Sequence, residues 1–417
     1  MMTKRNWLHK AKLLFLVIPA IIYADGLKEL LDYANTNNNL IVSKSLIQKA
    51  KQQEVDASKS LNSPTIDIGG FYQSLDERTP NMAGDIYSGY AKISYDIYDG
   101  GKKSSITKQK QNELKSSQFD TTAFKKSLSL QIVQEFFTIK NIDASLLALD
   151  EQRKSLKAQL NRVQKFYEAE ISTKDDIDKL QSAYDTNSYN IQSLKFQRLT
   201  TRQALELKVG KNISTLDKTK FIKQLDLNLE IDDNIKSLQA KENSLQNLAN
   251  SLNSAYLPQV NISDTYNING YSRSDTLHPD GLDNQNKLML SLNVRLFDGG
   301  SVSKRKQAIM INKQSLNSQI EYKTKEQKML FDLSKSRIDT SKLKIKSASS
   351  ALSSATSAYK TIDEKYKAGI VDNVAFLDAL SVKTNATALY EKSLNDLEVA
   401  YAIYYFYAGK NIQEFLK

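Results

Sequence analysis

The residue types that most often perform catalysis or bind metals are nearly absent from this 417-residue chain. It contains no cysteine and two histidines, His9 near the N-terminus and His278 in a loop rich in Pro, Asp and Gly. Disulfides, thiolate metal sites, cysteine nucleophiles, paired-histidine metal sites and Ser-His-Asp chemistry are therefore disfavoured. Carboxylates remain, but no pair of acids lies in an apolar, pocket-like stretch. We expect no enzyme, no metal site and no cofactor.

Two aspartates are notable because each follows an alternating segment and precedes a pair of glycines. An aspartate can accept hydrogen bonds from the first backbone N–H groups of a helix, and glycine permits an abrupt change of dihedral angles. We therefore predict that both sites are strand-to-helix junctions. They lie 199 positions apart, since 298 − 99 = 199, and consist of Asp99-Gly100-Gly101 and Asp298-Gly299-Gly300.

The same offset recurs elsewhere in the chain, which indicates one long unit present twice. Gly210-Lys211-Asn212 returns as Gly409-Lys410-Asn411, and Pro80 returns as Pro279. We expect a first structural repeat at 25–212, a second at 234–411, and a linker or short subdomain between them at 213–233. Residues 412–417 form a C-terminal tail.

The N-terminus has the features of a secretory signal. A basic head is followed by an apolar core at Leu13–Ile22, which is too short to span a bilayer comfortably. We expect residues 1–24 to be a signal peptide, with an uncleaved anchor helix as the alternative, and the chain to be exported in either case. The formal net charge of +11 is spread among acids rather than gathered in a stripe. Together with export, this argues against nucleic-acid binding.

Two regions alternate apolar and polar residues with period two, which predicts antiparallel hairpins at 64–99 and 258–298. A water-soluble sandwich also gives alternation, but strands of about ten residues or more in an exported chain favour a membrane barrel with a polar lumen. Four strands cannot close a barrel, because closed single-chain barrels need about eight. Several copies must then contribute strands. The apolar series of the last strand is Leu288, Leu290, Leu292, Val294 and Leu296.

After each Asp-Gly-Gly triplet, glycine and proline are absent, from Lys102 to Val209 and from Ser301 to Ala368. Apolar residues at three and four spacing predict, in each copy, a helix of about 65 residues, or roughly 100 Å, then a turn and a return helix. These long helices occupy 101–209 and 300–409. One helix of about 35 residues is expected from Leu27 to Leu61, and another from Asn234 to Tyr256.

This order of elements resembles the TolC-type outer-membrane efflux proteins, the outer membrane factors. The second turn adds to the likeness, with Tyr366-Lys367-Ala368-Gly369 followed by Phe376-Leu377-Asp378-Ala379. The resemblance implies a mainly α fold with a β-barrel part: a duplicated strand-strand-long helix-turn-helix unit, four strands per protomer in a trimeric 12-stranded barrel, and a long α-helical tunnel. It also implies the outer membrane of a Gram-negative cell, with most of the chain in the periplasm.

In the resembling family, the channel is the passive exit duct of a tripartite efflux or type I secretion system, gated at its periplasmic helical tip. Its partners are a periplasmic adaptor protein and an inner-membrane RND or ABC transporter. Drugs, metals and proteins are all cargo of similar ducts. The alternative function is a structural or adhesive coiled-coil surface protein, and an enzyme of the cell envelope is disfavoured by the missing chemistry.

The resemblance also implies roles for the helix turns. An acid bonds a tyrosine and an arginine at the family's closed tip, which points to Asp176 and Tyr366, whereas the arginine position holds Val371. Lys174 and Lys367 are candidate substitutes. Asp378 matches an inner acidic ring at the entrance, with Ala375 at the outer position. Without the family, Asp176 and Asp378 are ordinary helix-N-terminal acids. The expected adaptor-contact turns are Ala169, Glu170 (in place of the family's Gly), Ile171, Ala368, Gly369 and Ile370.

Overall fold

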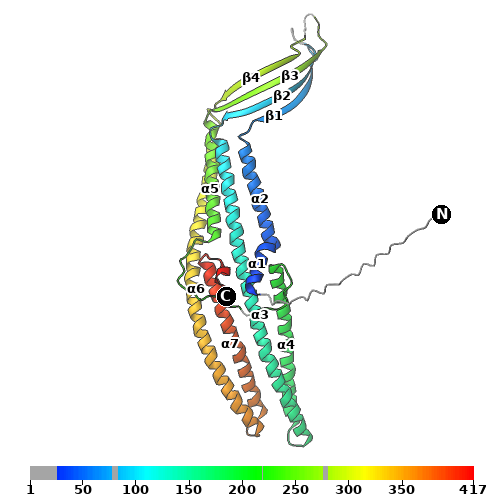
Figure 1. Ribbon diagram of the computed structural model, residues 1–417, viewed down its shortest axis with the longest axis vertical. Helices are drawn as coiled ribbons and strands as arrows, with labels where there is room; N and C mark the ends of the chain where they lie inside the picture. Colours follow the sequence, from blue (N-terminus) through cyan, green and yellow to red (C-terminus); the bar gives the residue numbers. More distant parts are fainter. Residues whose placement is uncertain (1–25, 78–82, 218, 276–279) are drawn as a thin grey trace, which may run out of the picture.

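The computed structural model describes residues 26–77, 83–217, 219–275 and 280–417. The predicted signal at 1–24 lies outside these residues. The described chain is elongated, with a sheet at one end and two helix turns at the other (Figure 1). Helices run between these ends, and the C-terminus lies near the middle of the long axis.

The N-terminal helical region is interrupted at Asn38, so the prediction of one continuous helix is wrong. Helix α1 spans Leu27–Asn37 and α2 spans Asn39–Ser60. Asn38 is extended, and its side-chain oxygen caps α2 by accepting the N–H of Leu40 at 2.9 Å. Its side-chain nitrogen donates to the carbonyl of Lys208 at 2.7 Å. Asparagine side chains can replace the helix as hydrogen-bond partners of nearby backbone groups. Here the bond to Lys208 also stabilises the break.

The four strands form one antiparallel sheet in the order β1-β2-β3-β4. Both predicted hairpins are present, and β2 pairs with β3 so that the two copies share a single sheet. The strands are β1 (Thr65–Ser74), β2 (Asp85–Tyr98), β3 (Gln259–Ser272) and β4 (Asn284–Asn293).

The register separates the sheet into one apolar and one polar face. Ile66 lies opposite Ile93, and Ile262 lies opposite Leu290. On the other face, Asp67 lies opposite Lys92, and Lys92 lies opposite Thr265. The apolar face is uncovered in the single chain: Ile68 is 86% exposed. Such a surface needs an apolar environment, because soluble monomers rarely expose contiguous apolar patches of this kind.

Strand β4 is shorter than its alternating sequence predicts. The alternation predicts a strand that continues to Leu296, but β4 ends at Asn293, which pairs with Gln259 at the start of β3. Beyond that pair, β3 offers no further backbone partner. Leu296 and Phe297 are consequently 89% and 84% exposed.

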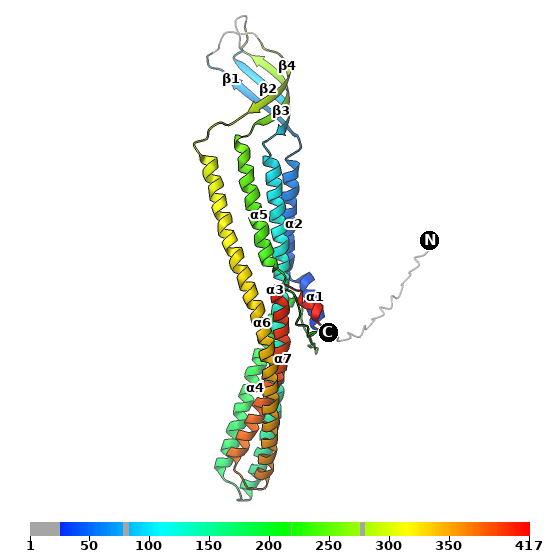
Figure 2. The same cartoon turned by 90° about the vertical axis from the view of Figure 1, so that its left-hand side faces the viewer.

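The long helices confirm the prediction from the missing breakers. Helices α3 and α6 have 67 residues each, or about 100 Å, and Figure 2 shows both running from the sheet end toward the turns. Among the described residues, no helix is both long and apolar enough to cross a membrane. The helices are α3 (Lys102–Glu168), α4 (Lys174–Val209), α5 (Asp233–Asn253), the short η1 (Ser254–Tyr256), α6 (Ser301–Lys367) and α7 (Asn373–Tyr407).

The segment between the copies packs against the middle of the helices. Phe221 is buried and forms a β-bridge with Leu416, just after the short helix η2 (Ile412–Phe415). The hydroxyl of Tyr405 donates to the carbonyl of Ile222, which anchors the segment to α7. The middle of the molecule is therefore a packed belt of aromatic residues with satisfied hydroxyl groups.

This belt predicts a loss of stability in alkali. Tyr405 has no exposed surface, and burial raises its pKa from 10.0 to about 12. Below pH 10 the tyrosine is neutral in both states; between pH 10 and 12 only the unfolded state ionises, so folding loses about 3 kcal/mol. Thermal unfolding in detergent across this range should show the decline, and Tyr405→Phe should flatten it. Equal alkaline slopes in both proteins would contradict the prediction.

Candidate functional site

Each Asp-Gly-Gly triplet precedes a long helix and has the same backbone in both copies. The first glycine of each has φ +69° and the second has φ +81°, a left-handed region that favours glycine. The carboxylate of Asp99 accepts the N–H of Gly101 at 2.9 Å and of Lys103 at 2.6 Å. Asp298 accepts the equivalent N–H groups at 2.9 and 2.8 Å. The triplets thus turn the chain sharply into α3 and α6.

The second junction has one additional contact. The hydroxyl of Tyr256, just after α5, donates to Asp298 at 2.7 Å. This hydrogen bond is the main reason that the pKa of Asp298 lies below its usual value, and the N–H of Val302 lowers it further. The contact ties the end of α5 to the start of α6.

The two helix turns at the opposite end also share one backbone conformation. Glu170 has φ +61° and Gly369 has φ +75°. In both, the next N–H reaches back to a carbonyl five residues earlier: Ile171 to Phe166 at 2.8 Å and Ile370 to Lys365 at 2.9 Å. This left-handed helix ending normally favours glycine. The first turn adopts it with a glutamate.

Asp176 has its own partners in the first turn. Its carboxylate accepts from the hydroxyls of Ser172 at 3.1 Å and Thr173 at 3.0 Å, and Thr173 in turn caps α4. Among the described residues of one chain, no hydrogen bond joins Asp176 to Tyr366. Asp372 likewise caps α7 through the N–H of Ala375 at 3.0 Å.

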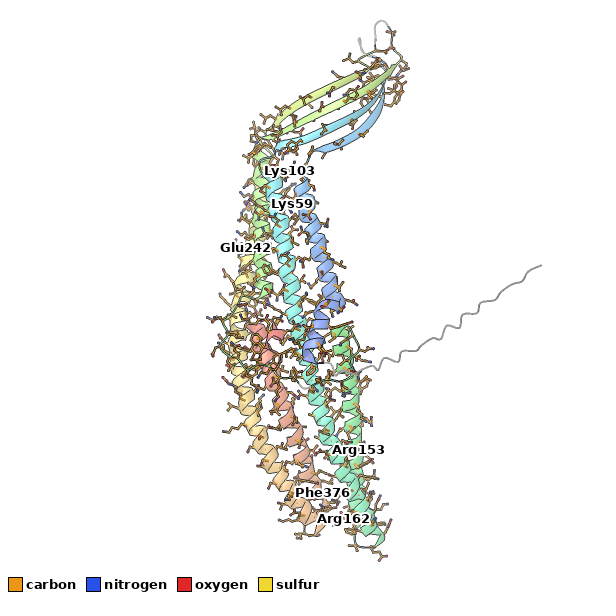
Figure 3. The ribbon with its side chains drawn as sticks, viewed as in Figure 1. Lys59, Lys103, Arg153, Arg162, Glu242 and Phe376 are labelled. Carbon is orange, nitrogen blue, oxygen red and sulfur yellow. The ribbon has the colours of Figure 1, made fainter. Side chains whose placement is uncertain are left out.

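Tyr366 instead belongs to a small cluster where α3, α6 and α7 meet. Its ring stacks on Phe376 with centroids 4.9 Å apart, and Phe376 has no exposed surface. The guanidinium of Arg162 lies 5.8 Å from the Tyr366 ring and donates to the carbonyl of Lys367 at 2.7 Å. Figure 3 shows Arg162 and Phe376 near this end of the molecule. Burial raises the pKa of Tyr366, with Asp176 adding to the rise and Arg162 opposing it.

The cluster joins the two helical hairpins rather than stabilising one of them. Phe376 of the second copy packs with apolar residues of the first, and the Asn373 side chain donates to the carbonyl of Asp176 at 3.4 Å. We define this tip cluster as Leu156, Leu160, Val163, Leu180, Phe376 and Leu380, with Tyr366 and Arg162 at its edge. Breaking it would separate the hairpins.

Comparison with known protein families is decisive for this architecture. The sequence model of the outer membrane efflux protein family matches residues 30–211 and 225–404. The chain belongs to this family. It is therefore an outer-membrane efflux channel, and the alternative of a structural or adhesive coiled-coil surface protein has no support. The family is of a passive channel type and not an enzyme family. Comparison with curated protein sequences gave no match.

Solved structures of bacterial outer-membrane proteins share the fold at low sequence identity. The CmeC channel of Campylobacter jejuni has a TM-score of 0.82 at 17% identity, covering 93% of this chain and 86% of that one. VceC of Vibrio cholerae has a TM-score of 0.78 at 13% identity, covering 93% of this chain and 96% of that one. The open-state MtrE channel of Neisseria gonorrhoeae has a TM-score of 0.77 at 14% identity, covering 93% of this chain and 89% of that one. Each likeness concerns the fold.

Arg162 is the residue of this efflux protein that sequence reasoning missed. The resemblance places the tip arginine in the second copy, where Val371 stands, with Lys174 and Lys367 as candidate substitutes. In the structure the arginine beside Tyr366 comes from α3 of the first copy, while Lys367 pairs with Asp363.

Asp378 lies exposed on α7, two residues after Phe376. Within the described part of this efflux protein, no group of three or more His, Cys, Asp or Glu side chains is placed to hold a metal ion. An acidic ring at Asp378 would therefore need the same residue from other protomers.

The strained first turn predicts a stabilising substitution. Glu170 holds φ +61°, a conformation that costs a residue with a Cβ atom roughly 1 kcal/mol or more relative to glycine. We expect Glu170→Gly to stabilise the tip by about 1 kcal/mol. Slower hydrogen exchange of the amide groups at 166–174 would show it. The control is Gly369→Ala at the second turn, which should destabilise by a similar amount. Faster exchange in Glu170→Gly, or no loss of stability in Gly369→Ala, would contradict the prediction.

Proposed function

We propose that the channel is a homotrimer whose sheets join into one 12-stranded barrel in the outer membrane of a Gram-negative cell. The support comes from the sheet edges, since β1 and β4 each have one neighbouring strand among the described residues. Unpaired backbone groups are too costly in lipid. Pairing β4 of one protomer with β1 of the next protomer removes both edges. Heat-modifiable, detergent-dependent trimers are expected, and a soluble elongated particle would contradict the proposal.

The observation that carries the proposed transport path is a two-faced sheet joined to two helices of equal length. We infer that the polar face lines the lumen and that the helices extend it as a periplasmic tunnel of about 100 Å. In this scheme residues 1–24 are the signal, 25–212 and 234–411 are the two repeats, 213–233 joins them, and 412–417 closes the chain. Most of the chain would then lie in the periplasm.

We further propose that the helix turns form a gate at the periplasmic tip. Asp176 and Tyr366 remain its proposed members, supported by the contribution of Asp176 to the raised pKa of Tyr366 and by the hydrogen bond from Asn373 to the carbonyl of Asp176. Arg162 would replace the family's arginine, whose position in the second repeat holds Val371. Because it bridges the Tyr366 ring and the carbonyl of Lys367, it holds the hairpins together.

The outer surfaces of the tip are the proposed sites of partner contact. Three copies of Asp378 would form an acidic ring that attracts cations at the entrance. The turns around Glu170 and Gly369 are proposed to contact a periplasmic adaptor, since they share one backbone shape. Efflux channels of this kind work with adaptor proteins and inner-membrane transporters; for this chain an RND or ABC transporter is proposed. Drugs, metals and proteins all remain candidate cargo.

Removal of Arg162 tests the gate directly. Arg162→Ala deletes a charged hydrogen bond to a carbonyl and a cation–π contact, together worth about 2 kcal/mol at this half-buried position. We expect the fraction of time that the channel conducts to rise by about 30-fold in planar bilayers. Arg162→Lys should give an intermediate value, because lysine keeps the charge but lacks the planar fork.

The matched control is Arg153→Ala. Arg153 lies on the same helix, nearer the sheet, and pairs with Asp150 one turn earlier (Figure 3). It should leave the conductance of the closed channel unchanged. Equal conductance of wild type and Arg162→Ala would contradict a gate at Arg162, whereas equal increases in both variants would indicate a general loss of helix packing.

A further inference from the structure

Asp264 occupies a position on the sheet that the apolar pattern does not explain. It lies in β3 between Ile262 and Tyr266, and the register places it opposite Ile93 on one side and Leu288 on the other. Side chains two apart on a strand share a face. Asp264 is therefore an acid in the middle of the apolar face, where ionisable groups are rare and mark functional sites by default.

The carboxylate is partly enclosed, and one of its oxygen atoms has no hydrogen-bond partner in the described part of the chain. Its Oδ1 atom is buried and forms no hydrogen bond with any described residue. A buried acceptor without a donor is costly, and an unpaired carboxylate more so. A cavity of about 350 Å³ opens beside it, lined among others by Pro64, Ile93, Tyr95, Ile262 and Leu288.

This chain does not supply a cation to that cavity from its strands. The four strands contain two basic residues, Lys92 and Lys287. Both lie in the row of Asp67 and Thr265, one residue away in register and therefore on the opposite, polar face. The neutralising group at Asp264 must come from outside the sheet.

We propose that Asp264 binds the primary ammonium headgroup of an aminophospholipid, whose acyl chains lie along the adjoining apolar face. The occupant must combine a cationic hydrogen-bond donor with an apolar body, because the carboxylate is flanked by Ile93 and Leu288, which are 43% and 71% exposed. A phospholipid amine meets both requirements. This inference rests on the proposed barrel, whose apolar face would meet the bilayer.

The depth of the site fits a lipid of the leaflet on the helix side. Asp264 is the sixth residue of β3, which begins at Gln259 beside the helices. At about 3.4 Å per residue and a tilt of about 45°, it lies about 12 Å from that end. A headgroup amine drawn slightly inward and a carboxylate leaning outward can meet at this level.

The test compares lipids retained by the full-length channel. Protein reconstituted in vesicles of equal phosphatidylethanolamine and phosphatidylcholine is extracted, and bound lipid is counted by native mass spectrometry. Wild type should retain the ethanolamine lipid about tenfold over the choline lipid, which has a charge but no N–H donor. Asp264→Asn and Asp264→Leu should abolish this preference, and Asp264→Glu should keep it. The matched control, Asp67→Asn on the polar face, should also keep it.

Three results would overturn the proposal. They are equal retention of both lipids by wild type, an unchanged preference in Asp264→Asn, and carbodiimide coupling of Asp264 to a protein amine rather than to lipid. Bilayer conductance of the same samples separates this proposal from the channel itself. A conducting wild type without lipid preference contradicts the lipid site alone, whereas a chain that binds the lipid but never conducts contradicts the proposed channel.

Discussion

Phe376→Ala is expected to open the tip of the channel. The side chain has no exposed surface, stacks on Tyr366, and packs against α3 and α4 of the first repeat in the same chain. Removing such a ring costs about 3–5 kcal/mol, because the lost transfer energy adds to the cavity that remains. That exceeds the contribution of about 2 kcal/mol from Arg162. The conducting fraction in planar bilayers should therefore rise by more than the roughly 30-fold expected for Arg162→Ala.

Two variants control for a general loss of stability. Phe376→Leu keeps most of the volume and should raise conductance only slightly. Ile177→Ala changes the equivalent position of the first copy, since 376 − 199 = 177, where the side chain is only half-buried. It should have a smaller effect than Phe376→Ala. A Phe376→Ala channel that stays as closed as wild type, while folding normally, would exclude the tip cluster as the element that holds the hairpins together.

The features that sequence predicted well are those that depend on neighbouring residues. The Asp-Gly-Gly triplets fix their own dihedral angles and cap their own helices. Both therefore adopt the same backbone conformation, whatever packs around them. The 67-residue helices follow from the absence of breakers over a long span. The strand faces follow from alternation, which the register of the sheet preserves.

The features that sequence did not predict depend on a distant partner. Asn38 ends α1 because the carbonyl of Lys208, 170 residues away, accepts its side chain; nothing within the local periodicity forces a break. Strand β4 ends at Asn293 because its partner β3 begins at Gln259, although the alternation itself continues. Arg162 reaches Tyr366 only because α3 and α6 meet at the tip. Local pattern cannot show such contacts.

Gly409→Ala is expected to weaken the middle of the molecule by about 2–5 kcal/mol. Gly409 has φ +79°, and a Cβ atom there would lie 2.6 Å from the carbonyl oxygen of Glu230. The left-handed backbone costs about 1–2 kcal/mol, and overpacking against backbone adds about 1–3 kcal/mol. The carbonyl cannot retreat freely, because it accepts a hydrogen bond from the side chain of Gln327 at 2.7 Å. Thermal unfolding in detergent measures the loss.

The repeat supplies the matched control for this prediction. Gly210 is the equivalent glycine of the first copy and has φ +89°, but a Cβ atom there would meet its nearest neighbour, the carbonyl of Asn37, at an ordinary 3.7 Å. Gly210→Ala should therefore lose only the backbone contribution of about 1–2 kcal/mol. The difference between the two variants isolates the clash with Glu230. Equal losses would mean that the segment before α5 moves aside at no cost, and that the middle of the molecule is a loose joint rather than the packed belt that anchors α7.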